Sequence, residues 1–229
     1  MLKPILSIII PVYNEKETIA EAITRVFSLD IFKEVIVVDD CSTDGTTEII
    51  KGLQSKYDFN YLRNETNRGK GYSVAIGAKS ATGEFMIVED SDLELNYQNI
   101  PELLKLLQAE KLDMVNGDRD IYNSPDVNKI SKLAKLVTKS LLFLLYRQNI
   151  NDILSSYKLC RLDAFLDLKL ESERFGLETE WIIKAIKKGW KIKEQKIDYY
   201  PRKVKAGKKI NAWDGIDIVW NIIKYRFSD

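Results

Sequence analysis

The sequence has no histidine among its 229 residues and only two cysteines. The lack of histidine excludes Ser-His-Asp and Cys-His catalysis and His-ligated metal sites. Cys41 and Cys160 stand far apart, without metal-ligand spacing or a disulfide framework, which indicates a reducing compartment. Acid–base and metal chemistry therefore fall to carboxylates, and phosphate binding falls to lysine, arginine and backbone amides.

An excess of charge is also lacking, because 35 lysines and arginines balance 34 aspartates and glutamates. This balance does not indicate a nucleic-acid partner. No apolar run approaches the roughly 20 residues of a spanning helix, and residues 1–6 leave no room for a signal peptide. We therefore expect a cytoplasmic protein that lies at most on a membrane surface, and the sequence indicates no oligomeric state.

Short apolar runs alternate with amphipathic segments through the first half of the chain. The apolar runs predict strands at residues 5–10, 35–38, 59–62, 85–88 and 114–117. Helical spacing predicts helices over residues 16–27, 47–57, 71–81 and 101–110. This alternation is typical of an α/β fold with a doubly wound, mostly parallel sheet and helices on both faces.

The pattern changes after about residue 118. It predicts a helix over 128–146, an extended segment over 153–161, a helix over 178–188, a strand over 192–200 and a helix over 212–225. No repeat, low-complexity segment or linker interrupts the chain, so we expect a single domain.

Polar residues follow three of the predicted strands, at Tyr13-Asn14-Glu15, at Asp39-Asp40 and at Glu89 to Glu94. Ligands of such sheets bind beyond the carboxyl ends of the strands, so these three segments predict the binding site. Acceptor carboxylates at Asp39-Asp40 suit the edges of a base or ribose hydroxyls; a capping and turn cluster is the alternative.

Asp90 and Asp92 flank Ser91 at a strand end, where alternate residues can turn toward one ion. Hard oxygen ligands with open positions suit Mg²⁺ or Mn²⁺ clamping a diphosphate. Glu94 would be a third ligand or would orient the others. The alternative is a solvated acidic turn before a helix that begins near Gln98.

Two basic segments have open interpretations. The turn from Asn67 to Gly71 opens a helix and favours an anion, unless it is an ordinary loop. Four lysines of the helix over 128–146 share one face, opposite an apolar side: Lys129, Lys132, Lys135 and Lys139. That helix would lie on an anionic membrane surface, or pack on the core with its lysines in solvent.

Together these segments resemble the family 2 glycosyltransferases, and within them the polyprenyl-phosphate, dolichyl-phosphate mannose synthase-like group. The resemblance covers nearly the whole chain and runs through residues 11–15, 38–46, 67–71, 89–94, 117–119, 152–158, 174–178, 200–210 and 214–215. It implies a GT-A fold, with a nucleotide-sugar-binding half over residues 1–118 and an acceptor-binding half over 119–229. Ser91, Cys41 and Asp118 depart from the commoner alanine, glycine and serine.

The resemblance also implies roles for individual residues. The residues implied to bind a UDP- or GDP-hexose are Pro11, Tyr13, Glu15, Asp40, Lys70, Asp90, Ser91 and Lys208. The metal ligands for Mg²⁺ or Mn²⁺ would be Asp90, Asp92 and Glu94. The catalytic residues would be Asp92, Arg119, Asp152 and Arg202, with Arg119, Arg202 and Lys208 facing the donor diphosphate or the acceptor phosphate.

The implied reaction is inverting, metal-dependent transfer of a hexose to a polyprenyl phosphate. A phosphate carrying about 1.5 to 2 negative charges attacks without a strong base, which suits a chain without histidine. Spanning helices are common in this group; here the helix from Asn128, with Trp213 and Trp220, would provide any membrane contact.

Other functions stay open. A saccharide hydroxyl as acceptor would need a carboxylate base, for which Asp152, Glu178 and Glu180 are candidates. A nucleotidyltransferase would carry a glycine-rich segment after the first strand, and Val12 to Glu15 contains no glycine. A non-catalytic sugar-nucleotide-binding protein is the remaining alternative.

Overall fold

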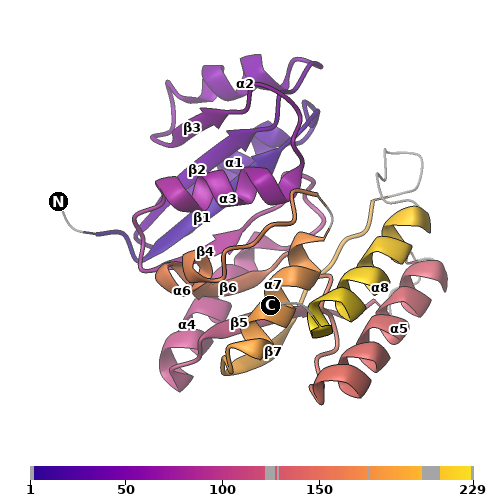
Figure 1. Cartoon of the computed structure of the whole chain (residues 1–229). Helices are drawn as coiled ribbons and strands as arrows, with labels where there is room; N and C mark the ends of the chain where they lie inside the picture. Colours follow the sequence, from indigo (N-terminus) through magenta and orange to yellow (C-terminus); the bar gives the residue numbers. More distant parts are fainter. Residues whose placement is uncertain (1–2, 122–126, 128, 175, 203–211, 228–229) are drawn as a thin grey trace.

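The computed structural model describes residues 3–121, 127, 129–174, 176–202 and 212–227. Seven strands form one sheet in the order β3-β2-β1-β4-β6-β5-β7 (Figure 1). The strands are β1 (Leu6–Val12), β2 (Lys33–Asp39), β3 (Asn60–Arg63), β4 (Phe85–Val88), β5 (Met114–Arg119), β6 (Lys158–Arg161) and β7 (Ile192–Ile197). Only β6 runs antiparallel to its neighbours, β4 and β5. The predicted doubly wound, mostly parallel sheet is confirmed.

The described helices are α1 (Ile19–Phe27), α2 (Thr46–Leu53), α3 (Lys70–Ser80), α4 (Ile100–Glu110), α5 (Lys129–Tyr146), α6 (Leu162–Asp167), α7 (Leu177–Lys187) and α8 (Ala212–Phe227), with a 3-10 turn η1 (Tyr97–Asn99). The pattern did not predict α6, a short helix that follows β6 without a turn. The extended segment predicted over 153–161 is a strand only from Lys158, and β7 ends at Ile197 rather than at Tyr200.

β1 runs two residues beyond its predicted end and includes Pro11. Proline lacks an amide donor and normally interrupts a central strand. Here the β1–β4 ladder ends with the pair Ile9 and Val88, while pairing with β2 continues to Val12. The carbonyl of Pro11 accepts a hydrogen bond from Ser91 Oγ (3.2 Å), which ties the loop after β4 to the end of β1.

The two faces of the sheet bury separate cores. Alternate residues of β1, such as Ile8 and Ile10, pack with α1, α2 and α4, whereas Ile9 faces α3, α6 and α7. This period of two is what a strand dictates when both faces are covered. Figure 1 shows α5 and α8 side by side, farther from the sheet, where α8 also contacts α7.

The orientation of α5 differs from that of an ordinary amphipathic surface helix, which exposes its lysines and buries its leucines. Lys135 is buried at 4% exposure, whereas Leu133 and Leu144 are exposed at 59% and 63%. The interpretation of α5 as a core-packing helix with a solvated lysine face is therefore wrong. Asp118, 2.6 Å from the Lys135 ammonium, makes the burial of that charge possible.

The turn before α3 packs closely against the segment that precedes α7. Tyr72 N donates to the carbonyl of Glu173 (3.1 Å), and a Cβ at Gly71 would lie 1.9 Å from the carbonyl oxygen of Ser172. Only a residue without a side chain allows this backbone approach. The contact fixes where α3 begins, and with it the position of Lys70.

We predict that Gly71→Ala lowers the free energy of unfolding by about 2 kcal/mol, because its methyl group must push the backbone of residue 172 away. Urea unfolding followed by circular dichroism measures the change.

Gly52→Ala is the matched control, because a Cβ there meets nothing within 4 Å and the residue lies in α2. It should stabilise the protein by about 0.5–1 kcal/mol. Equal effects of the two substitutions would contradict the packing described around Gly71.

Candidate active site

The polar segments after β1, β2 and β4 meet at one edge of the sheet, as predicted. Asn14 N donates to Ser42 Oγ (3.0 Å) and Glu15 N donates to Thr46 Oγ1 (2.9 Å), so the segments after β1 and β2 are joined. Ser91 joins the segment after β4 to Pro11. We call these three segments, Tyr13–Glu15, Asp39–Asp40 and Glu89–Glu94, the strand-end site.

Arg202 joins the second half of the chain to the strand-end site. Its Nη2 donates to Glu15 Oε2 (2.9 Å), and its Nε donates to the carbonyl of Asp92 (2.9 Å). Its backbone amide donates to Glu94 Oε1 (3.0 Å). The structure therefore brings Glu15, Asp92, Glu94 and Arg202 together, although they are 187 positions apart in sequence at the extremes.

A chain of charges links Asp90 to α7. The Lys70 ammonium lies 2.7 Å from Asp90 Oδ1 and 2.7 Å from Glu178 Oε1. Burial works to raise the pKa of Asp90, but the Lys70 charge and hydrogen bonds from Lys70 and Ser156 outweigh it and lower that pKa. Asp90 is thus held ionised beside a cation.

Asp92 lies close to two other carboxylates, those of Asp90 and Glu94. Burial, Asp90 and Glu94, in that order, raise the pKa of Asp92 to about 7. A divalent cation at Asp90 and Asp92 would offset this repulsion, and both residues offer the hard oxygen atoms that Mg²⁺ and Mn²⁺ prefer. The donor set therefore fits a divalent metal.

Glu94 is committed to the protein instead. Its Oε2 accepts a hydrogen bond from the Tyr199 hydroxyl (3.0 Å), and its Oε1 accepts the Arg202 amide. Among the described residues, no three Asp, Glu, Cys or His side chains form a ready metal-binding group. Asp90 and Asp92 would hold a metal with phosphate oxygens completing the shell, as is common for Mg²⁺; ligation by Glu94 stays a prediction.

Asp40 caps the turn before α3. Its carboxylate accepts hydrogen bonds from the amides of Arg68 (2.9 Å) and Gly69 (2.6 Å) and from Asn64 Nδ2 (2.8 Å). The amides of Arg68 and Gly69 were among the donors predicted for an anion at residues 67–71, and the protein itself satisfies them. The ordinary-loop interpretation of this turn is the better one, and a contact of Asp40 with a base stays a prediction.

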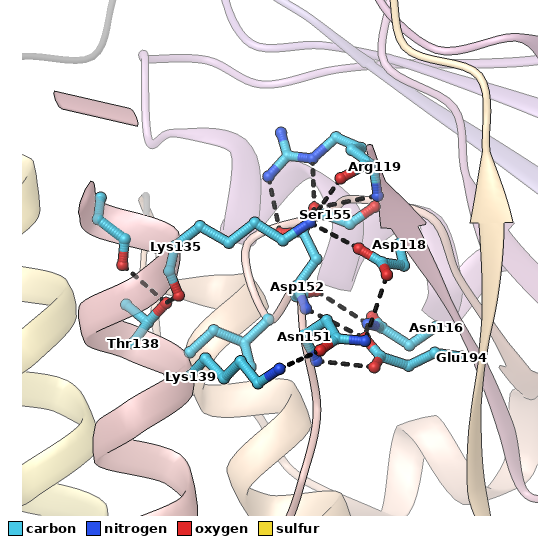
Figure 2. A network of polar contacts seen from close by, with 12 residues as sticks. Asn116, Asp118, Arg119, Lys135, Thr138, Lys139, Asn151, Asp152, Ser155 and Glu194 are labelled. Atoms are coloured by element: carbon cyan, nitrogen blue, oxygen red, sulfur yellow. Dashed lines mark hydrogen bonds and ion pairs between the residues drawn. The ribbon is translucent and has the colours of Figure 1, made fainter. Parts of the chain in front are cut away.

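Arg119, Asp152 and Lys135 form a buried network at the end of β5 (Figure 2). Arg119 Nε and Nη2 donate to the two oxygens of Asp152 at 2.8 and 3.0 Å. The Lys135 ammonium lies 3.6 Å from Asp152 and bonds Asp118 and the Arg119 carbonyl. Burial opposes ionisation of Asp152, but the charges of Arg119 and Lys135 lower its pKa.

Glu194 of β7 supports this network and was not predicted. Its Oε2 accepts the Asn151 amide (2.7 Å) and its Oε1 accepts the Asp152 amide (3.1 Å). Asn116 Nδ2 donates to the same Oε1 (3.1 Å). A single glutamate in a polar edge strand gives no sequence signal for such a role.

A pocket of about 820 Å³ lies beside this network, between α5, the loop after it and β7. Its charged lining includes Lys135, Lys139 and Lys196 with Asp118 and Asp120; its apolar lining is Leu136, Phe143 and Leu144. The Lys139 ammonium is held by Asn151 Oδ1 (2.6 Å), as Figure 2 shows. We call this space the α5 pocket. Its mixed lining suits an anion that carries an apolar part.

The three candidate bases differ in their surroundings. Asp152 is 1% exposed and paired with Arg119. Glu180 is fully buried and accepts the amides of Glu171 and Ser172, so it supports the loop before α7. Glu178, 12% exposed and one lysine away from Asp90, is the one of the three that adjoins the strand-end site.

Other predicted residues are less defined. Tyr13 is half-buried after β1, whereas Lys208 lies outside the described residues. The pattern also missed Tyr157, which donates a hydrogen bond to Glu89, the residue that precedes Asp90. Burial, opposed by that bond and supported by Asp90 and Asp92, raises the pKa of Glu89 to about 8.

Sequence comparison identifies relatives over most of the chain. The family model described as "Glycosyl transferase family 2" matches residues 7–168. Glycosyltransferase AglJ of Haloferax volcanii is 29% identical over 197 residues, covering 85% of this chain and 63% of AglJ. The uncharacterized protein MJ0544 of Methanocaldococcus jannaschii is 28% identical over 234 residues, covering 96% of this chain and 99% of MJ0544.

A poly-beta-1,6-N-acetyl-D-glucosamine synthase of Staphylococcus epidermidis is also 28% identical over 209 residues. The match covers 86% of this chain and 48% of the synthase, so this chain spans only part of AglJ and of the synthase.

Structural comparison gives the fold. Glucosyl-3-phosphoglycerate synthase of Mycobacterium tuberculosis, solved with Mn²⁺, UDP and phosphoglyceric acid, superposes with a TM-score of 0.75 at 18% identity. The match covers 98% of this chain and 79% of that chain. The predicted GT-A fold is confirmed, whereas the division into halves at residue 118 stays a prediction.

Within the part of the chain that the structure describes, no helix has the length and apolar character needed to cross a membrane.

We predict that Asp152→Asn destabilises the protein by about 3 kcal/mol at pH 7, because Arg119 and Lys135 lose the charge that compensates their burial. The folded pKa of Asp152 is lowered, so its contribution is present above the ordinary aspartate pKa of about 4 and is lost as the pH falls through the folded value. Urea unfolding of wild type and variant at pH 7 and pH 3 measures the difference, which should shrink at pH 3.

Asp163→Asn is the matched control, because Arg161 donates the same pair of bidentate hydrogen bonds to Asp163 at the protein surface. It should cost no more than about 1 kcal/mol. A cost for Asp152→Asn no larger than this would show that the buried network stabilises little.

Proposed function

The chain belongs to glycosyl transferase family 2, and on that premise we propose that it moves a hexose from a UDP- or GDP-sugar to a polyprenyl phosphate, with inversion and with Mg²⁺ or Mn²⁺. In this it would act like the dolichyl-phosphate mannose synthase group, at the cytoplasmic surface of a membrane. The observation that carries the proposal is the strand-end site, where Arg202 and Lys70 meet Glu15, Asp90 and Asp92.

The strand-end site supports binding of a nucleotide sugar. Ligands of doubly wound sheets bind beyond the carboxyl ends of the strands, and Pro11, Tyr13 and Glu15 border this edge. The structurally similar glucosyl-3-phosphoglycerate synthase has been solved with UDP-glucose and Mn²⁺ and with UDP and Mg²⁺. We infer that Lys70 and Arg202 face the donor diphosphate. The other residues proposed to bind the nucleotide sugar at this edge are Pro11, Tyr13, Glu15, Asp40 and Ser91.

Asp90 and Asp92 are the proposed metal ligands, with Glu94 beside them holding Tyr199 and Arg202. A divalent cation bound there would stabilise the negative charge of the leaving diphosphate. Arg202 holds the loop by bonding the Asp92 carbonyl and Glu15, so the two aspartates keep their spacing before any ligand arrives.

The α5 pocket supports an acceptor that is both anionic and apolar. Lys139 and Lys196 contribute positive charge to its lining, and Phe143 and Leu144 contribute apolar surface. A polyprenyl phosphate combines these two chemistries in one molecule. Arg119, directly after Asp118 of the pocket, would orient the phosphate toward the strand-end site; its guanidinium also lies 5.3 Å from the centre of the Tyr199 ring.

The outer face of α5 and α8 supports contact with a membrane surface. Leu133 of α5 and Trp220 of α8 are exposed and do not line the α5 pocket, and Phe227 is 83% exposed. α5 carries no acidic residue, which suits an anionic lipid surface. Trp213, also predicted to contact lipid, has no described side chain.

The proposed reaction needs positioning more than proton transfer. A phosphate acceptor is already charged and attacks the anomeric carbon directly, so the residues must hold two anions in line. Lysine and arginine near both ends of the path, Lys70 and Arg202 at the donor and Arg119 at the acceptor, offset the repulsion between those anions. Displacement from the opposite face inverts the anomeric centre.

A saccharide hydroxyl is the second candidate acceptor. The position of the Glu178 carboxylate favours it. Its carboxylate lies beside Lys70 and hence close to Asp90, where a base would be needed. The poly-beta-1,6-N-acetyl-D-glucosamine synthase relative bears a name that fits such an acceptor.

We predict that Asp92→Ala abolishes Mn²⁺-dependent binding of UDP or GDP and leaves the fold intact, because Asp92 lies in a loop after β4. Calorimetric titration of UDP, GDP, UDP-glucose and GDP-mannose, with and without Mn²⁺, measures this. Asp58→Ala, an exposed aspartate before β3, is the control and should bind as wild type. Unchanged metal dependence in Asp92→Ala would remove the metal assignment.

We predict that Lys139→Gln combined with Lys196→Gln raises the KM for a polyprenyl phosphate about tenfold or more, because a phosphate loses two charge partners. The KM for the nucleotide sugar should stay the same. Lys51→Gln combined with Lys105→Gln, at exposed positions of α2 and α4, is the charge-matched control. An equal rise in both KM values, or none, would contradict an acceptor site in the α5 pocket.

A further inference from the structure

Lys70 stands where helix electrostatics disfavour a cation. It is the first residue of α3, whose first turn contains no acidic residue. The positive end of a helix dipole destabilises a lysine at this position. The side chain is nonetheless 23% exposed and lies between two carboxylates from other elements, Asp90 and Glu178, at 2.7 Å from each. The position of Lys70 is therefore explained by its ion pairs with Asp90 and Glu178 and not by helix stability.

The backbone under Lys70 is fixed from both sides. On one side, Asp40 accepts the amides of Arg68 and Gly69, the two preceding residues. On the other, Gly71 packs against the carbonyl of Ser172, closer than any side chain would allow. The Lys70 ammonium is consequently delivered to one place, beside Asp90, even when no ligand is bound.

That place is beside the oxygen atoms proposed to bind the metal. A divalent cation on Asp90 and Asp92 would stand next to the Lys70 ammonium and be repelled by it. Two like charges a few ångströms apart near a protein surface cost a significant part of any binding free energy. Lys70 and the metal therefore compete for Asp90.

A nucleoside diphosphate removes this competition. Its phosphate oxygens offer Lys70 a charge-assisted partner, so the ammonium can turn from Asp90 to the diphosphate while keeping Glu178. The diphosphate oxygens also complete the metal shell that the protein leaves open.

We propose that Lys70 occupies the cation position of the ligand-free site and gives way to the divalent metal only when a nucleoside diphosphate binds. Lys70 thereby makes the binding of metal and nucleotide mutually dependent. This inference rests on the proposed function, because it requires a metal at Asp90 and Asp92. By linkage, each ligand strengthens the other by the same factor.

The test titrates the protein with Mn²⁺ in the presence and absence of UDP or GDP. Electron paramagnetic resonance measures the free Mn²⁺ and hence the affinity. Wild type should bind Mn²⁺ weakly alone and at least tenfold more tightly with the nucleotide. Lys70→Gln should bind Mn²⁺ alone roughly tenfold more tightly than wild type and lose most of the enhancement. Lys70→Arg keeps the charge and should behave like wild type.

Lys79→Gln removes a charge from an exposed position of the same helix and should change nothing, and thermal unfolding checks that each variant is folded. If Lys70→Gln binds Mn²⁺ as weakly as wild type, or more weakly, the competition is refuted while the proposed metal site stands. If wild type binds no Mn²⁺ even with UDP or GDP, both the metal site and this inference fail. If Lys70→Gln does not fold, Lys70→Arg decides. Weak Mn²⁺ binding by Lys70→Arg without nucleotide, strongly enhanced by UDP or GDP, supports the inference. Tight Mn²⁺ binding by Lys70→Arg without nucleotide overturns it.

Discussion

The concentration of carboxylates at one edge of the sheet is the constraint on which the rest of the structure depends. Glu15, Asp90, Asp92 and Glu94 gather where three parallel strands end, and their mutual repulsion must be offset. Arg202 comes from beyond β7 and Lys70 from the start of α3 to supply the charge. The packing of Gly71 on residue 172 and the capping by Asp40 make sense as supports for that delivery.

The same principle extends to the second half of the chain. Asp152 is buried and ionised, and Arg119 and Lys135 neutralise it while Glu194 holds its backbone. Because Lys135 turns inward to do this, Leu133, Leu136 and Leu144 of α5 are exposed, although Leu142 remains buried in the core. The apolar outer face and the α5 pocket are therefore consequences of one buried charge network, and together they connect a proposed lipid acceptor to the donor edge.

The sequence predicted the features that follow from local pattern. Apolar runs placed the strands, and polar residues after them located the strand-end site. It could not predict the orientation of α5, because a lysine stripe is compatible with solvent as well as with a buried partner such as Asp118. Glu194 and Tyr199 were missed because their partners lie far away in sequence. The turn at residues 67–71 stayed open between an anion site and an ordinary loop, because nothing local shows that Asp40 accepts the amides of Arg68 and Gly69.

The most direct test of the central claim is the product formed from a nucleotide sugar, Mn²⁺ and a polyprenyl phosphate in vesicles, identified by mass spectrometry and by the anomeric coupling in NMR. The account predicts a lipid phosphate that has gained one hexose, with the anomeric configuration inverted relative to the donor. Transfer to a saccharide hydroxyl alone, or a retained configuration, would contradict it.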